Sequence, residues 1–261
     1  MDDAATEPSA DGAAATSWTV PAWPSRLTIG VLGGLIVLFN LPLLHYYLVR
    51  GPVPVTASVP YADDFSNPDT VEKNYFSTGG LWRTVNGELL SPGVKNNPLW
   101  LRASLPQDVA VEFDARSVSP EGDLKVEIFG DGTDHASGYV LIHGGWNNSL
   151  SVMARLDEHG PSIQSLEAEA RRRGGSDLVS TGVVTKDSRW RVEANPYPVQ
   201  VGRTYHWRIE RKGSRISWFI DGNKFMELSD PFPLAGKGHD RFAFSSWEAQ
   251  LYFDNLKIQP L

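Results

Sequence analysis

The chain has 261 residues, a formal net charge of −7 and no cysteine. An acidic chain without a basic stripe argues against nucleic acid as a partner, because phosphate contacts need clustered lysines and arginines. The absence of cysteine excludes disulfides, thiolate metal sites and cysteine nucleophiles together.

The N-terminal part of the chain combines a polar tail with a long apolar run. Residues 1–26 are rich in Ala, Ser, Thr, Asp and Pro, so we predict that this tail is disordered. The uncharged run 27–49 follows, and a helix of about 23 residues reaches roughly 34 Å, enough to cross a bilayer. Val55-Thr56-Ala57 fits the alternative of a cleaved signal peptide, but the leader is acidic and the run exceeds an ordinary signal core. We therefore predict one uncleaved transmembrane helix over 27–49.

Several positions in this run are candidates for contacts inside the membrane. Gly30, Gly33 and Gly34 leave one face of the helix without bulky side chains, so another helix can approach it closely. The alternative is that this face contacts lipid. Pro42 predicts a kink. His45 lies near the boundary, where it meets headgroups or, as the alternative, contacts a tetrapyrrole. The membrane-interface candidates are Gly30, Gly33, Gly34, Asn40 and His45.

The rest of the chain predicts an all-β domain. Residues 50–60 hold three prolines and form a semi-rigid tether. From residue 61 onward, apolar and polar side chains alternate over several segments, as in half-buried antiparallel strands. Asn86-Gly87 and Asp221-Gly222 are tight-hairpin dipeptides. A helix-prone insertion, 165–173, is the exception.

The C-terminal half resembles bacterial domains of the concanavalin A-like lectin/glucanase superfamily. The residues that carry the resemblance are Tyr205-His206-Trp207-Arg208-Ile209-Glu210-Arg211, Trp218-Phe219-Ile220-Asp221-Gly222 and Tyr252-Phe253-Asp254-Asn255-Leu256-Lys257-Ile258, with Asp63-Asp64-Phe65 at the start. The resemblance covers 61–261 and implies an antiparallel jelly-roll β-sandwich whose first and last strands pair. It also implies an extracytoplasmic domain, but fold alone implies no activity.

One loop and its surroundings are typical of a glycan-binding site. A tryptophan flanked by amides can stack on a sugar face and hydrogen-bond its hydroxyls. The alternative is a glycine bulge with Trp146 closing the core and asparagines capping a turn. The glycan-binding candidates are His143, Trp146, Asn147, Asn148 and Asp157.

Catalytic and metal signals are weak. The catalytic glucanases of the superfamily carry E-x-D-x-x-E, and the nearest match, Glu112-Phe113-Asp114, lacks the third carboxylate. Retaining glycosidases need two close carboxyls, so we expect Glu112 and Asp114 to lie on a solvated strand face. The loop 131–135 is oxygen-rich, and ordinary turn chemistry competes there with a calcium site. We predict no catalytic residues and no cofactor.

These observations lead to one main hypothesis and two alternatives. The main hypothesis is a non-catalytic single-pass protein of the bacterial inner membrane, with a cytoplasmic N-terminus and a periplasmic β-sandwich that associates with other membrane proteins. The first alternative is a lectin-like module that binds a polysaccharide. The second is a glycoside hydrolase-type enzyme.

Overall fold

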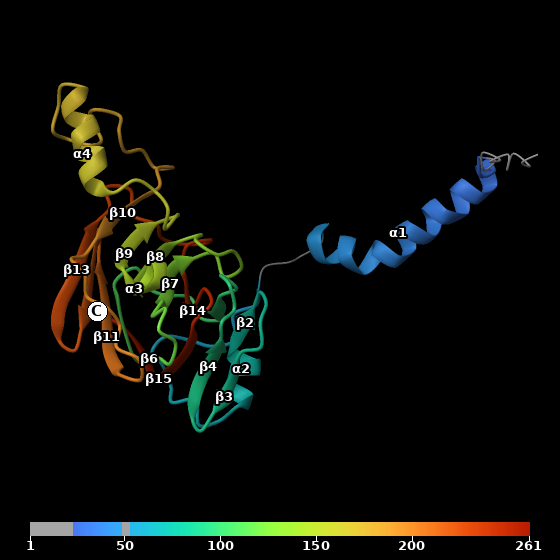
Figure 1. Cartoon of the computed structure of the whole chain (residues 1–261), viewed down its shortest axis with the longest axis horizontal. Coiled ribbons are helices and arrows are strands. Elements are labelled where there is room, and N and C mark those ends of the chain that lie inside the picture. Colours follow the sequence, from blue (N-terminus) through green and yellow to red (C-terminus); the bar gives the residue numbers. More distant parts are fainter. Residues whose placement is uncertain (1–22, 49–52) are drawn as a thin grey trace, which may run out of the picture. The chain divides into compact units, whose positions relative to one another are not determined.

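The computed structural model describes residues 23–48 and 53–261, which form two compact units, a helix and a β domain (Figure 1). Residues 1–22 of the predicted tail, residue 49 of the predicted membrane helix and residues 50–52 of the tether lie outside the described residues.

The first unit is the helix α1 (Arg26–Leu48), which covers nearly all of the predicted membrane run. It continues through Pro42, and Asn40 Nδ2 donates to the carbonyl of Ile36 at 2.7 Å. Arg26–His45 has the length and composition of a membrane-crossing segment, and none of it is buried.

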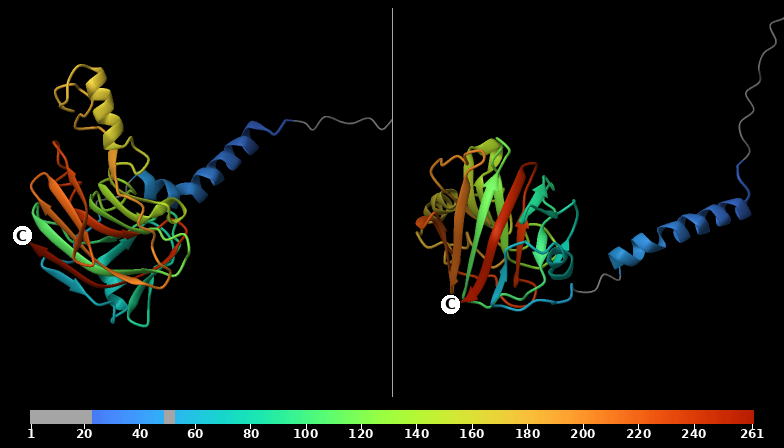
Figure 2. Two further views of the ribbon diagram at one scale, coloured as in Figure 1. Left: turned by 60° about the vertical axis from the view of Figure 1, so that its left-hand side comes forward. Right: turned by 90° about the horizontal axis from the view of Figure 1, so that it is seen from below.

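The second unit is a sandwich of two antiparallel sheets, which Figure 2 shows as facing layers. The eight-stranded sheet has the order β13-β12-β11-β6-β15-β4-β3, with β1 paired to β15. Its strands are β1 (Tyr61–Asp63), β3 (Arg83–Val85), β4 (Glu88–Pro92), β6 (Val109–Ser117), β11 (Thr204–Lys212), β12 (Arg215–Ile220), β13 (Asn223–Ser229) and β15 (Gln250–Pro260). The β1–β15 pairing confirms that the first and last strands pair.

The seven-stranded sheet has the order β10-β9-β8-β7-β14-β5-β2. Its strands are β2 (Tyr75–Ser77), β5 (Leu99–Leu101), β7 (Leu124–Gly130), β8 (Tyr139–Gly144), β9 (Leu150–Arg155), β10 (Trp190–Glu193) and β14 (Arg241–Ser245). The short helices are α2 (Asp69–Asn74), α3 (Gly145–Asn148) and α4 (Ile163–Arg172). The last of these is the predicted insertion, and Figure 1 shows it projecting from the sandwich.

The core lies between the two sheets and is rich in aromatic rings. Trp207 and Trp218 have ring centroids 4.3 Å apart, and Phe244 and Phe253 have centroids 4.5 Å apart. Each such buried side chain stabilises the fold by roughly 1.5–3 kcal/mol. The period-two pattern predicted the inward positions of Trp207 and Trp218, because alternate side chains of a strand point to opposite faces.

The hairpin predictions are also confirmed. Asn86 and Gly87 join β3 to β4 with φ of 53° and 82°, and Asp221 and Gly222 join β12 to β13 with φ of 51° and 77°. Both positions of a tight hairpin turn need positive φ, which Asn, Asp and Gly tolerate.

Candidate functional site

A pocket of about 340 Å³ lies on the face of the seven-stranded sheet that points away from the core. Lys125 on β7 pairs with Ile142 on β8, so both side chains lie on this face while Leu124 and Val126 enter the core. Five connecting segments of the chain surround this floor. The lining residues are Asn96, Glu121, Asp123, Lys125, Ile142, Trp146, Asn147, Glu158, His159, Trp247, Glu248 and Ala249.

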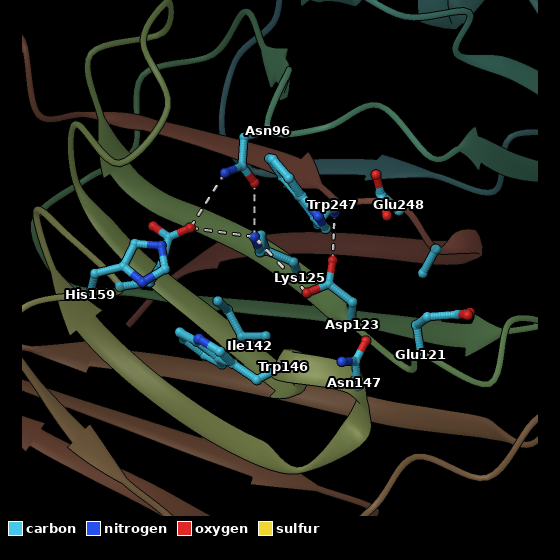
Figure 3. A pocket seen from close by; sticks show the side chains of 12 residues that line it. Asn96, Glu121, Asp123, Lys125, Ile142, Trp146, Asn147, His159, Trp247 and Glu248 are labelled. Carbon is cyan, nitrogen blue, oxygen red and sulfur yellow. Dashed lines mark hydrogen bonds and ion pairs between the residues drawn. The ribbon is translucent and has the colours of Figure 1, made fainter.

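Two tryptophans border the pocket on either side of Lys125 and Asp123 (Figure 3). Trp146 is 38% exposed and Trp247 is 48% exposed. The ring of His159 meets the Trp146 ring edge-on, with centroids 5.6 Å apart. Because large aromatic side chains are usually more buried, two half-exposed indoles at one concavity indicate a surface for a ligand.

Trp247 is fixed through its backbone. Its N–H donates to the carboxylate of Asp123, and its carbonyl accepts from Lys95 N at 2.7 Å. Asn96 N donates to Ser246 O at 2.8 Å, which ties the β4–β5 loop to the β14–β15 loop. The indole ring therefore stands on a backbone that is anchored from both sides.

A buried ammonium group forms the polar floor of the pocket. The Lys125 side chain is 3% exposed, and its Nζ donates to Asn96 Oδ1 at 2.9 Å. Nζ also lies 3.5 Å from Glu158 Oε1 and 4.0 Å from Asp123 Oδ1. Burial raises the pKa of Asp123, and the charge of Lys125 offsets part of that increase. A buried charge of this kind persists because it is paired and hydrogen-bonded.

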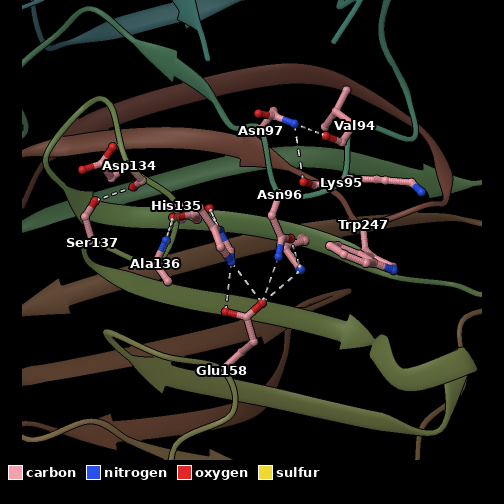
Figure 4. A network of polar contacts seen from close by, with 12 residues as sticks. Val94, Lys95, Asn96, Asn97, Asp134, His135, Ala136, Ser137, Glu158 and Trp247 are labelled. Atoms are coloured by element: carbon pink, nitrogen blue, oxygen red, sulfur yellow. Dashed lines mark hydrogen bonds and ion pairs between the residues drawn. The ribbon is translucent and has the colours of Figure 1, made fainter. Parts of the chain in front are cut away.

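Behind the floor, His135 bridges two carboxylates (Figure 4). Its Nδ1 lies 2.6 Å from Glu127 Oε1, and its Nε2 lies 3.0 Å from Glu158 Oε1. Burial alone would lower the pKa of His135, but the hydrogen bonds and charges of both glutamates outweigh it and raise the pKa to about 9. Burial would raise the pKa of Glu158, but His135 and Lys125 lower it to about 2. At neutral pH, imidazolium and carboxylate therefore face one another.

The turn that presents Trp146 is left-handed. Trp146, Asn147 and Asn148 have φ of 49°, 56° and 61°. The left-handed conformation costs about 1–2 kcal/mol for a residue other than glycine, and somewhat less for asparagine. Such strain is concentrated at functional sites, where the surrounding structure holds it in place.

The structure brings only part of the predicted glycan-binding set together. Trp146 and Asn147 line the pocket, whereas Asn148 bonds to the backbone of Val199. His143 is fully buried on the core side of β8, where its ring stacks on Tyr197 with centroids 5.1 Å apart.

Asp157 has a local role beside the pocket. Its carboxylate accepts from the N–H of His159 at 2.8 Å and lies 3.8 Å from Arg189. The adjacent residue, Glu158, is the one that lines the pocket.

Sequence reasoning missed Asn96, Asp123, Lys125, Glu158 and Trp247. The available signal was the series Asp123, just before β7, and Lys125 and Glu127 on β7, a strand whose other face is apolar. All three side chains are buried, whereas a solvated strand face would expose them. Trp247 lies in the loop after β14, and nothing local to it predicts which loops it meets.

The other carboxylate candidates lie away from this pocket. Glu112 and Asp114 on β6 pair with Arg208 and His206 of the neighbouring strand, as expected for a solvated strand face. Asp131 Oδ1 accepts from the N–H groups of residues 133 and 134, both at 2.7 Å, which closes the loop 131–135 as a turn. Among the described residues, no group of three or more His, Asp or Glu side chains is placed to hold a metal ion.

The membrane-interface candidates all lie on α1. A Cβ added at Gly30, Gly33 or Gly34 would meet nothing within 4 Å, and Asn40 and His45 are exposed. Of these five, Asn40 alone makes a side-chain hydrogen bond within the described part of the helix, to Ile36 O.

Comparison with known proteins supports the fold. The chain is similar to a sialidase with a TM-score of 0.51 and 14% identity, over 81% of this chain and 19% of that chain. It is also similar to the carbohydrate-binding module CBM66 from Bacillus subtilis, with a TM-score of 0.49 and 16% identity over 71% of this chain and 95% of that one. A protein of unknown function with a galectin-like fold from Bacillus subtilis has a TM-score of 0.45 and 11% identity, over 78% of this chain and 97% of that chain.

No family model and no curated protein matches the sequence. At 14% identity, the match to the sialidase shows a shared fold alone. The two antiparallel sheets confirm the predicted all-β antiparallel fold class.

Proposed function

We propose that the β domain binds carbohydrate in the pocket between Trp146 and Trp247. The observation that carries the proposal is the pair of half-exposed indoles beside a buried polar floor. A sugar ring offers a C–H face that packs on an indole, and hydroxyl groups that exchange hydrogen bonds with carboxylates and amides. The pocket volume of about 340 Å³ lies within the range of about 300–1,000 Å³ that is usual for ligand sites.

Binding is favoured over hydrolysis by the state of Glu158. Its oxygens already interact with His135, Lys125 and Asn96, and its side chain is 6% exposed. A nucleophile of a retaining glycosidase must reach the sugar carbon, and a carboxylate so fully engaged by protein donors is poorly placed to do so. The pocket also supports glycan binding more directly than it supports the predicted role as a subunit of a membrane complex.

The helix α1 gives the proposed module its location. We infer that Arg26–His45 crosses a bacterial inner membrane and holds the β domain on the periplasmic side. Its length and exposed apolar surface support this arrangement. The protein should stay in the membrane pellet after an alkaline wash, and protease added to spheroplasts should digest the β domain. Release by the wash would contradict the anchor, and protection from protease would contradict the orientation.

The test of glycan binding uses the full-length protein in a detergent without a sugar headgroup, because a glycoside detergent would compete. The protein is applied to a glycan array, and retained glycans are titrated by calorimetry. Trp146→Ala and Trp247→Ala should each weaken binding about tenfold or more, as is typical of a central aromatic contact. Trp23→Ala, at a 92% exposed tryptophan outside the β domain, is the control. The absence of any retained glycan, or unchanged affinity in both pocket variants, would overturn the proposal. A measured sugar hydrolysis lost in Glu158→Gln would replace binding by catalysis.

A further inference from the structure

The pocket is lined by more carboxylates than cations. Four carboxylates line it, those of Glu121, Asp123, Glu158 and Glu248, against the one ammonium of Lys125. A ligand that enters this space leaves bulk water, so the sign of its own charge affects its binding energy more strongly than it would at an open surface.

The cations around the pocket are already paired. Lys95 Nζ lies 2.9 Å from Glu248, and Arg191 Nη2 lies 2.7 Å from Glu193. Lys125 is held by Asn96 and by two carboxylates, as described above. A carboxylate or sulfate on a ligand would therefore have to displace an existing protein partner in order to find a cation.

The rim of the pocket also carries one carboxylate, that of Glu121, without a cation of its own among the described residues. Glu121 is exposed and, within residues 23–48 and 53–261, makes no ion pair. Figure 3 shows Glu121 and Glu248 at the same end of the pocket, on the side of Asp123 away from His159. The carboxylates at this end would attract a protonated amine on a ligand and would repel an anionic group.

We infer that the pocket accepts neutral and amine-bearing sugars and excludes anionic sugars such as uronates, sialates and sulfated residues. This inference rests on the proposed glycan binding and names its ligand class. It follows from four lining carboxylates, one engaged lysine and neighbouring cations that already have partners.

The test compares neutral glycans on an array with their uronate, sialylated, sulfated and free-amine counterparts, using the full-length protein in the same detergent. Retained glycans should be neutral or amine-bearing, and each anionic counterpart should be retained less than its neutral parent. Raising the salt concentration from about 0.05 M to about 0.5 M should narrow this difference, because salt screens exposed charges. Anionic glycans retained as well as their parents would overturn the inference and leave glycan binding intact. No retention of any glycan would instead overturn the proposed function.

Variants test whether the named charges cause the exclusion. Glu121→Gln and Glu248→Gln should each raise the ratio of anionic to neutral binding, by up to about fivefold. Glu72→Gln removes one negative charge from an exposed position on helix α2, outside the pocket, and should leave that ratio unchanged. A ratio that moves in neither rim variant would contradict the charge-based exclusion.

Discussion

Asn148 holds Val199 through both ends of its carboxamide. Its Nδ2 donates to the carbonyl of Val199, and its Oδ1 accepts the N–H of Val199, both at 2.7 Å. These two bonds connect the left-handed turn that carries Trp146 to the segment before β11. The side chain predicted to contact a glycan thus fixes the turn that places the neighbouring indole over the pocket.

Replacing Asn148 should destabilise this turn. Glycine tolerates positive φ, so Asn148→Gly removes the two hydrogen bonds without adding backbone strain. Chemical denaturation should show a loss of about 1–3 kcal/mol, because buried partners are left unpaired. Asn147→Gly is the matched control at φ 56°, where the exposed side chain has no hydrogen bond within the described residues, and should change stability by about 0.5 kcal/mol or less. Equal effects of the two variants would contradict the role of the Val199 contact.

The buried lysine should matter far more than an exposed one. Lys125→Met removes the ammonium that faces Asp123 and Glu158, so buried Asp123 loses its nearest cation and Glu158 keeps only its contact with His135. A loss of about 3–5 kcal/mol is expected in urea denaturation, since a broken buried pair leaves an uncompensated charge. Lys95→Met breaks the exposed pair with Glu248 and should change stability by less than about 1 kcal/mol. A well-folded Lys125→Met variant of unchanged stability would show that the pocket floor does not need this charge.

The bridge at His135 predicts a loss of stability at alkaline pH. Its pKa is raised from 6.5 to about 9 in the folded protein, so its contribution is fully present below about pH 6.5 and is lost as the pH rises through about 9. Between about pH 7 and pH 10, the loss should be about 2 kcal/mol.

The measurement is the free energy of unfolding across this range for the wild type and for His135→Gln. The loss of unfolding free energy between about pH 7 and pH 10 should be present in the wild type and absent in His135→Gln, because the other groups titrate alike in both proteins. His206→Gln, at a histidine that is about half exposed beside Asp114, should keep the wild-type slope. A His135→Gln profile parallel to that of the wild type would show that the bridge does not titrate in this range.

Much of the sandwich could be predicted from the sequence, but only part of the pocket. The alternation of apolar and polar residues, as in Val109 to Arg116, identifies a strand from the residues of that strand alone. The pocket is built from loops that are distant in sequence. Asn96, Glu158 and Trp247 lie close together only because of the order of the strands in the sheet. Predicting it would require knowing that β7 and β14 are neighbours, which depends on the packing of the whole sandwich.

His143, a glycan-binding candidate in the sequence, is buried in the structure, and its burial predicts sensitivity to acid. Burial lowers its pKa from 6.5 to about 4, an effect that the bond to the carbonyl of Tyr197 only partly offsets. The neutral ring packs among Tyr197, Tyr205 and Trp218, so the stability it contributes is present above about pH 6.5 and is lost as the pH falls through about 4.

His143→Phe should keep the aromatic packing and remove this titration. Unfolding followed between about pH 7 and pH 4 should show a shallower loss of stability in the variant, by about 2–3 kcal/mol over the range. His159→Phe is the control, because that histidine is exposed at the pocket rim. If the His143→Phe variant lost stability toward pH 4 as steeply as the wild type, the buried neutral imidazole would not be the source of the acid sensitivity.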